Sequence, residues 1–525
     1  MFKPPVLAVV LATFGLASAA PPIVRLDAAV VTGFSNGTIN KFLGIPFAEA
    51  PRFRLPRLTQ SYIGHINATA FGPTCPQQLL TPTSPLIPFV VLPPSSISED
   101  CLSLNIYVPA GTSPSAKLPV AFWIYGGGFE IGSTESSDAT ITRIVERSVA
   151  LNLPMIQVSV NYRGSAYGFL AGKEVAKERI GNFGLYDQRT GIEWVHKYIH
   201  AFGGDPTKVT LYGSSSGSIS VSLQMLAFGG QIKNLFRGAF MQSGAPIPVG
   251  PIERGQVMYD QLVQDTGCAR ASSSLQCLRT VSFEALAAAV NKSSNIFDYR
   301  ALNIAWLPRV DGVFLQDLPF AQIKAGKVPR IPIVSGNSDD EGTIFSFAQS
   351  NLTTDEDFRA YAKTIWFPAA SDVELTPLWT SYPSVASEGS PFGTGDLNQV
   401  YPQFKRIAAF QGDIVFQNPR RYFLHNISGK QKVWSYLSKL LKSTPFVGSF
   451  HGTEAAVPFL DDYFIQFVTN LNPNTGVAGT VWPEYASQSP NMLTFNDTSA
   501  PFITQDTYRA AGMEVLTDLV VKYPL

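Results

Sequence analysis

Short apolar runs alternate with amphipathic stretches along most of this chain. Each run is brief, rich in β-branched or aromatic residues and bounded by turn residues, which is typical of buried strands in a largely parallel sheet. Stretches such as Tyr186–His200, with apolar residues at helical spacing, lie between them. This order predicts an α/β fold with a mostly parallel central sheet and helices on both faces. The predicted strands are Leu118–Tyr125, Pro154–Val160, Val209–Tyr212, Ile331–Ser335 and Lys432–Leu437.

Composition supports a large folded core. Of the 525 residues, 45% are hydrophobic and only 15% are charged, against a usual charged fraction of about 25%. Lys and Arg together number 39, as do Asp and Glu, and no basic cluster is present, which argues against nucleic acid as a partner. Because no Pro/Ser-rich linker divides the chain, we expect a single domain over 20–525, with 76–100 and roughly 340–400 as irregular excursions.

The first nineteen residues read as a secretory signal peptide. Lys3 supplies a positive charge, Val6–Leu16 is an apolar run, and Ala17-Ser18-Ala19 is a small-residue cleavage site. The alternative is a membrane anchor, but the run is shorter than the roughly 20 apolar residues that a span needs. No later segment reads as a transmembrane helix. We therefore expect a secreted, extracellular protein.

Gly213-Ser214-Ser215-Ser216-Gly217 matches the pattern G-x-S-x-G. A strand-like run precedes it and the helix-capable stretch Ser218–Phe228 follows, which is the context of a nucleophile elbow. Ser215 is the only one of the three serines with glycines at both −2 and +2. Because Ser-Gly-rich turns are common, the pattern alone also fits an ordinary turn. The sequence predicts Ser215 as a candidate nucleophile.

A second signal is Gly126-Gly127-Gly128-Phe129, directly after a predicted strand. A triple glycine exposes backbone N–H groups that can donate to a developing oxyanion. The alternative is a plain glycine-rich turn. A phosphate-binding loop is less favoured, because neither G-x-G-x-x-G nor G-x-x-x-x-G-K-[ST] is present.

A serine nucleophile needs an imidazole base and an acid that orients it. In the order Ser, acid, His, only His425 and His451 lie far enough downstream. His425 precedes a glycosylation sequon, a surface signature, so we favour His451. The acid is expected in Asp339-Asp340-Glu341, after the strand at Ile331–Ser335. Spacing alone does not choose among the three carboxylates.

Four cysteines and six N-x-[ST] sequons agree with secretion. In an oxidising compartment the cysteines are expected to form two disulfides, and the sequence alone allows three pairings. No Cys/His spacing supports a metal site. The sequons are candidate glycosylation sites at the surface. The cysteines are Cys75, Cys101, Cys268 and Cys277, and the sequon asparagines are Asn36, Asn67, Asn291, Asn351, Asn426 and Asn496.

Together these residues resemble the type-B carboxylesterase/lipase family of α/β-hydrolases, which includes fungal lipases and cholinesterases. The resemblance covers nearly all of the chain after the signal peptide. It rests on the nucleophile and glycine motifs and on an ordered set of further segments: Phe42–Glu49, Ser98–Asn105, Asn161–Arg163, Gly181–Gln188 and Phe202–Pro206.

The resemblance implies a role for each candidate residue. Ser215 looks like the nucleophile, His451 the base and Glu341, which matches the family's Glu before Gly, the acid. The oxyanion donors look like the N–H groups of Gly127, Gly128 and Ser216. The disulfides would be the local pairs Cys75–Cys101 and Cys268–Cys277, and Glu99 would form a structural ion pair with Arg52. No metal or cofactor is implied.

Three departures from the family stand out. Ser214 occupies the position where the family usually has Glu, which removes one negative charge near the imidazole. Ser216 replaces the usual Ala, although its N–H remains available. The segment Ala48–Pro56 is shorter than the usual family loop.

The loop closed by Cys75 and Cys101 is at the family's lid position. It contains the apolar run Leu86–Leu92, which either covers the active site and meets a lipid–water interface or packs on the body as core. The loop lacks the Trp with which cholinesterases hold choline, so we do not expect a choline ester as the substrate.

We therefore expect a secreted serine hydrolase acting through an acyl-enzyme on apolar or bulky esters. The options are a lipase, a sterol esterase, a general carboxylesterase or a feruloyl-type esterase. The rival hypothesis is a catalytically inactive adhesion or binding protein on the same fold, but the nucleophile, base, acid and glycine loop are all in place.

Overall fold

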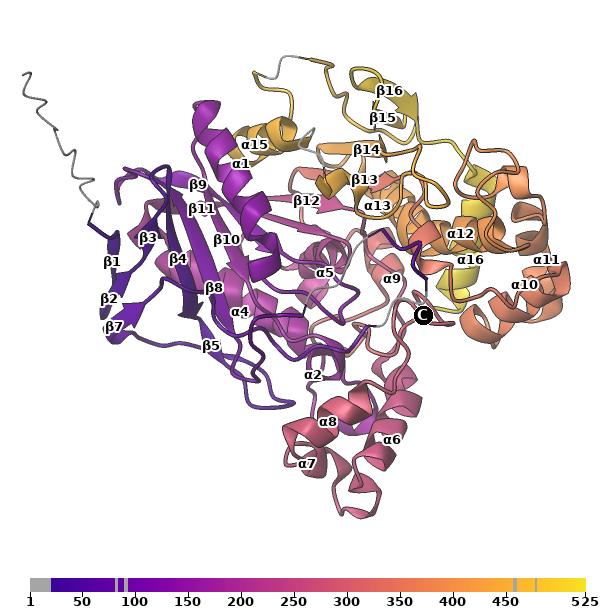
Figure 1. The fold of residues 1–525 in the computed structure, drawn as a ribbon, viewed down its shortest axis with the longest axis horizontal. Coiled ribbons are helices and arrows are strands. Elements are labelled where there is room, and N and C mark those ends of the chain that lie inside the picture. The colour runs from indigo at the N-terminus through magenta and orange to yellow at the C-terminus, as the bar shows by residue number, and fades with distance from the viewer. Residues whose placement is uncertain (1–19, 81–83, 89–92, 457–459, 477–478) are drawn as a thin grey trace, which may run out of the picture.

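The computed structural model describes residues 20–80, 84–88, 93–456, 460–476 and 479–525. The predicted signal peptide and residues 89–92 of the apolar lid run lie outside the described residues. Figure 1 shows a large twisted sheet through the middle of the molecule, with a helical lobe containing α6–α8 projecting from one side. Within the described part of the chain, no helix has both the length and the apolar character to cross a membrane.

An eleven-stranded sheet organises the fold, in the order β16-β15-β14-β13-β12-β11-β9-β10-β8-β4-β3. The strands from β10 across to β15 run parallel, while β8, β4, β3 and β16 pair antiparallel. A three-stranded sheet, β1-β2-β7, and the pair β5-β6 complete the N-terminal part. The strands are β1 Ile23–Leu26, β2 Ala28–Thr32, β3 Phe34–Ser35, β4 Ile39–Pro46, β5 Ala48–Glu49, β6 Arg57–Leu58, β7 Ile63–Asn67, β8 Ser103–Pro109, β9 Leu118–Ile124, β10 Ile156–Val160, β11 Gly204–Ser214, β12 Gly238–Gln242, β13 Ile333–Ser338, β14 Val433–Lys439, β15 Asn491–Asn496 and β16 Phe502–Gln505.

Helices cover both faces of this sheet. Helices α4 and α5 pack on one face, and α1 and α15 pack on the other. The helices are α1 Asp138–Ala150, α2 Ser165–Phe169, α3 Lys173–Lys177, α4 Phe183–Tyr198, α5 Ser216–Gly230, α6 Gln256–Asp265, α7 Ser274–Leu278, α8 Phe283–Val290, α9 Pro319–Lys324, α10 Asp355–Tyr361, α11 Asp372–Ser381, α12 Phe404–Gly412, α13 Asn418–Ile427, α14 Thr453–Ala456, α15 Asp461–Asn470 and α16 Ala510–Lys522. The predicted α/β architecture is confirmed.

The apolar runs are continuous because the central strands are buried on both faces. Successive residues of a strand point to opposite sides. In β11, Leu211 enters the core shared with α4 and α5, and Tyr212 enters the core beside α15. In β9, Phe122 and Ala121 divide in the same way. A strand with one solvated face would instead have alternated with polar residues.

The expectation of an irregular excursion over roughly 340–400 was wrong in part. Helices α10 and α11 lie in this range. Each begins with a capping box, in which a hydroxyl side chain and an acidic residue three positions later satisfy each other's backbone N–H groups. The pairs are Thr354 with Asp357 and Ser371 with Glu374. The capping boxes therefore mark where these two helices begin, although neither helix has the marked apolar periodicity that would predict it from the sequence.

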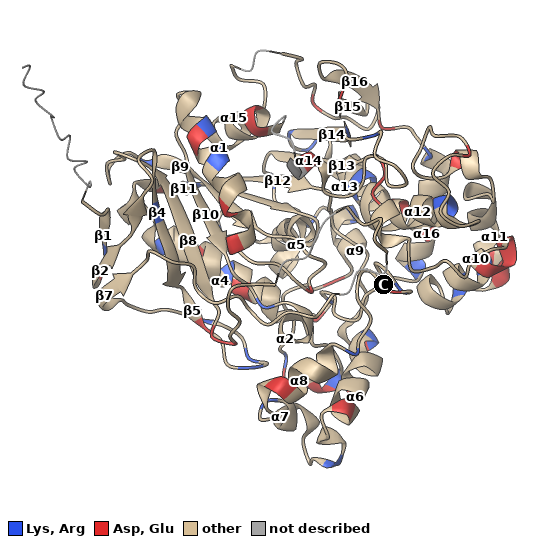
Figure 2. Ribbon diagram, in the orientation of Figure 1, with Lys and Arg blue, Asp and Glu red and all other residues tan. Residues whose placement is uncertain are grey.

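Charged residues are scattered along the ribbon, and the basic ones form no stripe in the view of Figure 2. Charged groups are also buried inside the protein, and one such cluster surrounds Asp506. Asp506, which follows β16, accepts hydrogen bonds from Arg420 and Arg421 of α13 and from the hydroxyl of Tyr485. Burial raises the pKa of Asp506, but the two guanidinium groups hold it well below its usual value. This cluster, the Asp506 clamp, fastens α13 to the C-terminal edge of the sheet.

Removing the charge of Asp506 should destabilise the fold strongly. Asp506→Asn leaves two buried guanidinium groups without a counter-charge, and we expect it to lower the free energy of unfolding by about 3–5 kcal/mol. Urea unfolding followed by tryptophan fluorescence measures this change. Asp462→Asn is the matched control, because its exposed pair with Arg147 is worth about 1 kcal/mol or less. Equal effects of the two variants would contradict the importance of the clamp.

Candidate active site

Ser215 occupies a strained turn between β11 and α5. Its φ of 57° and ψ of −128° lie outside the regions that non-glycine residues normally adopt, which costs about 1–3 kcal/mol. A Cβ atom on Gly217 would lie 2.0 Å from the carbonyl oxygen of Ile124, and one on Gly213 would lie 2.5 Å from the backbone of Gly217. Both glycines are therefore required by close approach. The backbone N–H of Ser215 donates to the carbonyl of Gln242 at 2.9 Å, which fixes the turn against the end of β12.

The glycine loop lies against this turn. A Cβ atom on Gly126 would lie 2.9 Å from the Cβ of Ser215. Gly127 and Gly128 have φ values of 114° and 66°, and within the described residues no acceptor is found for their N–H groups. The N–H of Ser216 is in the first turn of α5, where no preceding turn supplies an acceptor. Among the described residues, these three N–H groups therefore have no hydrogen-bond acceptor.

His451 and Glu341 are in direct contact. Nδ1 of His451 lies 2.5 Å from Oε2 of Glu341, and its Nε2 is buried with no hydrogen-bond partner among the described residues. The rings of Phe345 and Phe416 pack against the imidazole. Burial lowers the pKa of His451, but the charge and hydrogen bond of Glu341 raise it, and the net pKa lies above the usual 6.5. Nε2 is thus left as the available acceptor for a proton.

The sheet brings these elements together. Ser215 follows β11, Glu341 follows β13, and His451 lies beyond β14. These strands are parallel, with β12 between β11 and β13, so their carboxyl ends meet at one edge, which is where ligands bind in open α/β sheets.

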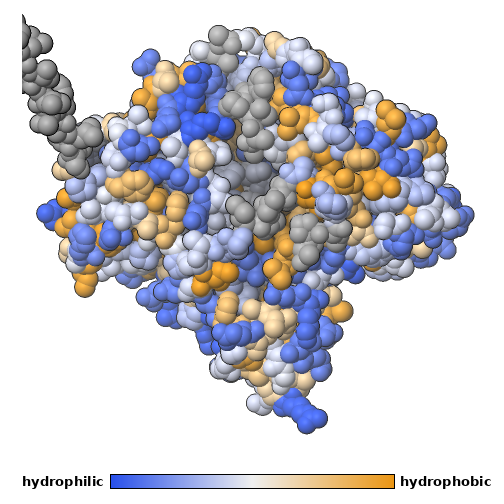
Figure 3. Space-filling model, in the orientation of Figure 1, coloured by the Kyte–Doolittle hydropathy of each residue, from blue (hydrophilic) through white to orange (hydrophobic). Residues whose placement is uncertain are grey.

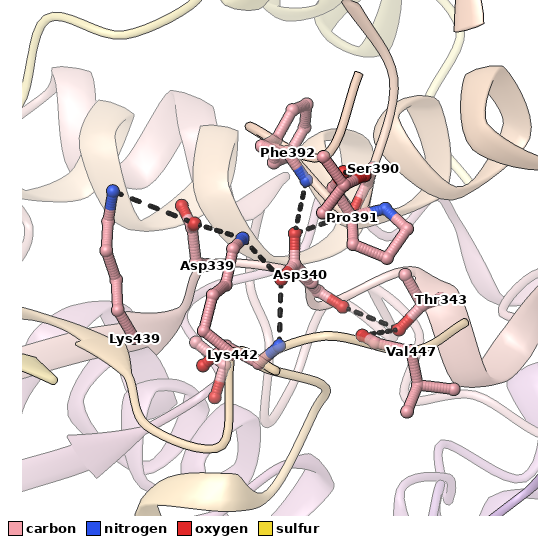
Figure 4. Close-up of polar contacts among 12 residues, drawn as sticks. Asp339, Asp340, Thr343, Ser390, Pro391, Phe392, Lys439, Lys442 and Val447 are labelled. Carbon is pink, nitrogen blue, oxygen red and sulfur yellow. Dashed lines mark hydrogen bonds and ion pairs between the residues drawn. The ribbon is translucent and has the colours of Figure 1, made fainter. Parts of the chain in front are cut away.

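The other two carboxylates of the predicted acidic run have different partners, shown in Figure 4. Asp340 accepts hydrogen bonds from the hydroxyl of Ser390, from the backbone N–H groups of Phe392 and Ser449, and from Lys442. Asp339 also pairs with Lys442. Asp340 therefore ties three loops together, and Glu341 alone of the three reaches the imidazole.

The sequence reasoning missed two residues beside Glu341. The hydroxyl of Ser243, just beyond β12, donates to Glu341 Oε1 at 2.7 Å and also contacts the carboxyl group of Glu454. Glu454 is 2% exposed. The one available signal was position: Ser243 follows the strand between those that carry Ser215 and Glu341, and Glu454 lies three residues after His451.

A cavity of about 370 Å³ lies behind the glycine loop. Its lining includes Gly126, Gly127, Trp123, Ser214, Glu454 and Phe464. Ser214, at the position where the family usually has Glu, therefore lines this cavity with a small hydroxyl side chain and no carboxylate.

Among the residues that the structure describes, no group of three or more His, Cys, Asp or Glu side chains is arranged to hold a metal ion.

The remaining predicted contacts are also present. The disulfides are Cys75–Cys101 and Cys268–Cys277, as the resemblance implied. Arg52 and Glu99 form a two-pronged ion pair, with Nε to Oε1 at 2.7 Å, so the shorter Ala48–Pro56 loop preserves it. His425 lies near the end of α13 and makes a ring contact with Tyr485, away from Glu341.

The sequon asparagines differ in exposure and in bonding. Asn426 lies inside α13, and its side-chain amide donates to the carbonyl of Tyr422 at 2.8 Å. Asn496 is half-buried and accepts from three groups in its own turn. Asn36, Asn67, Asn291 and Asn351 are exposed. Glycosylation at the six sites stays a prediction.

Comparison with known proteins identifies the family. Residues 20–461 match the model of the carboxylesterase family. The chain belongs to this family. It is 40% identical to Lipase 4 of Diutina rugosa, over 97% of this chain and 98% of the relative. It is 37% identical to the secreted triacylglycerol lipase LIP1 of Gibberella zeae, over 95% and 90%. The crystal structure of Aspergillus niger EstA superposes with a TM-score of 0.82 at 26% identity, covering 96% of this chain and 99% of EstA. This carboxylesterase-family chain is a carboxylic ester hydrolase of the α/β-hydrolase fold.

Replacing Glu341 and Asp340 one at a time by their amides should show which of the two carboxylates takes part in catalysis and which one holds loops together. Glu341→Gln should lower kcat by about 10³-fold or more, because the amide does not stabilise the imidazolium or fix its tautomer. Asp340→Asn should lower kcat by less than about tenfold while lowering the thermal midpoint, because Asp340 holds loops. Steady-state kinetics on a soluble ester measure kcat for both variants, and thermal unfolding measures their midpoints. The reverse ranking in kcat would move the acid to Asp340.

Proposed function

We propose that this chain is a secreted serine esterase in which Ser215 is the nucleophile, His451 the general base and Glu341 the acid. The N–H groups of Gly127, Gly128 and Ser216 form the oxyanion hole. The observation that carries the proposal is the 2.5 Å contact between His451 Nδ1 and Glu341, which leaves Nε2 without a hydrogen-bond partner among the described residues. Ser215, Glu341 and His451 all follow neighbouring parallel strands at the same carboxyl edge of the sheet.

The chemistry follows from these positions. His451 Nε2 takes the proton of the Ser215 hydroxyl as Oγ attacks the ester carbonyl, and Glu341 stabilises the resulting imidazolium. The backbone donors stabilise the negative charge on the former carbonyl oxygen, and each is worth about 10²–10³ in rate. His451 then protonates the departing alcohol, which leaves an acyl group on Ser215. Water, activated by His451, attacks that acyl-enzyme and releases the acid.

The substrates proposed are esters with long or bulky apolar groups, acylglycerols first among them. Two features support this choice. The relative from Gibberella zeae is named a triacylglycerol lipase. The Cys75–Cys101 loop exposes Leu79, Leu86 and Ile97, and the N–H of its Gln78 donates to the carbonyl of Glu130 just after the glycine loop. The base of the predicted lid is thus bonded to the predicted oxyanion loop.

The molecular surface is consistent with an apolar substrate. Figure 3 shows a hollow near the middle of the face, with hydrophobic residues gathered beside it in the region where α12 lies in Figure 1. Exposed apolar surface around a hollow is typical of sites that meet lipid or other apolar partners. Secretion is supported by the two disulfides and by relatives that are named secreted lipases.

Initial rates across p-nitrophenyl esters of increasing acyl length test the substrate class. We expect rates to rise with chain length and to increase sharply above the solubility limit, because the apolar loop then meets an interface. Ser215→Ala, the control, should lose turnover and keep its fold. Rates that peak at short chains without a jump would contradict the lipase proposal and favour soluble esters. Substantial activity in Ser215→Ala would overturn the nucleophile itself.

A further inference from the structure

Glu454 places a second carboxyl group beside the proposed catalytic acid, and the mechanism above gives it no role. It lies on α14, three residues after His451. Its Oε1 contacts the hydroxyl of Ser243, and its Oε2 accepts a hydrogen bond from the hydroxyl of Ser338 at 2.7 Å. Ser243 is shared, because its hydroxyl also lies 2.7 Å from Glu341 Oε1.

The number of protons available between Ser243 and the two carboxyl groups limits the charge that Glu454 can carry. A serine hydroxyl carries one proton and can donate to one carboxylate at a time. If both carboxyl groups were ionised, one of them would face the lone pairs of Ser243 at hydrogen-bond distance with no proton between them. A buried contact of that kind is strongly unfavourable. One carboxyl group must therefore hold a proton that points at Ser243.

The surroundings place that proton on Glu454. Glu341 Oε1 already accepts from the backbone N–H of Ser338 at 2.7 Å and from the side chain of Asn337 at 3.1 Å, and its Oε2 faces the imidazole. Glu454 has no backbone donor and no cationic partner within the described residues.

The ionisable groups that face Glu454 agree with this assignment. Burial raises the pKa of Glu454, and the negative charge of Glu341 raises it further, against smaller lowering effects of His451 and of the two serine hydroxyls. From β14, the buried phenol of Tyr436 faces the two glutamates and has its own pKa raised well above 10.0. None of these groups supplies a fixed positive charge.

We propose that Glu454 is a positioning residue that stays protonated while the enzyme works. Its O–H donates to Ser243, and Ser243 is thereby committed to donate to Glu341. The inference rests on the proposed catalytic function and adds a neutral carboxylic acid to the end of the Ser215–His451–Glu341 chain.

The neutral state of Glu454 matters for the base. An ionised Glu454 would be a second anion near His451, would raise the pKa of the imidazole and would leave less neutral base at a given pH. Ser214 acts in the same direction, because it and Glu454 line one cavity and a carboxylate at 214 would share that space. Among the described residues, Glu341 is then the one anion in contact with the imidazole.

The test is the pH dependence of kcat/KM on a soluble p-nitrophenyl ester for the wild type and Glu454→Gln. The amide donates to Ser243 and accepts from Ser338 as the neutral acid does, so we expect the acid limb to stay within about 0.2 pH unit of the wild type. If Glu454 is an anion, its removal lowers the pKa of His451 and shifts the limb to lower pH by about one unit. That shift would overturn the proposal, as would a Gln variant that fails to fold.

Two further measurements test separately whether Glu454 is protonated and whether it acts through Ser243. The infrared difference spectrum between the wild type and Glu454→Gln should contain the carbonyl band of a protonated carboxyl group, and a carboxylate band in its place would overturn the proposal without reference to activity. Ser243→Ala should lower kcat about tenfold with KM little changed. Glu454→Leu, which removes the O–H donor to Ser243, should lower kcat in the wild type but add nothing in the Ser243→Ala background. Additive effects would contradict the link through Ser243. Full activity in Ser215→Ala would instead overturn the function on which the inference rests.

Discussion

The active site is organised around the buried carboxylate of Glu341. A carboxylate that is 1% exposed is tolerated only when its oxygens are satisfied. Here a backbone N–H, an amide, a hydroxyl and an imidazole supply the bonds, through Ser338, Asn337, Ser243 and His451. These donors come from β13, from the end of β12 and from the loop beyond β14, so the charge is stable only when the strands are in register.

The same carboxylate is connected to the C-terminal part of the fold. Arg420, held in the Asp506 clamp, donates from Nε to the side-chain oxygen of Asn337 at 2.6 Å, and Asn337 in turn donates to Glu341. The clamp thus orients the Asn337 amide, since an amide whose oxygen accepts from Arg420 presents its N–H₂ to Glu341. A structural ion cluster and a catalytic position share one hydrogen-bond path.

Much of this arrangement is predictable from local signals, and the rest depends on three-dimensional convergence. The strands and the Ser215 turn have short-range signatures, because buried strands need apolar runs and the elbow needs Gly213 and Gly217. Spacing did not choose Glu341 over Asp340; the family resemblance did, and the structure adds the reason, since Asp340 is occupied by Lys442 and loop N–H groups. Ser243 and Glu454 have no motif, because their roles arise from a shared hydroxyl between segments 211 residues apart.

A Ser215 held in a strained turn and activated by His451 and Glu341 should react covalently with serine-directed probes. The most direct measurement is to treat the folded protein with a fluorophosphonate probe and to locate the adduct by peptide mass spectrometry. We predict a single adduct at Ser215, formed slowly or not at all in Glu341→Gln. A protein that stays unlabelled, or an adduct on Ser214 or Ser216, would contradict it.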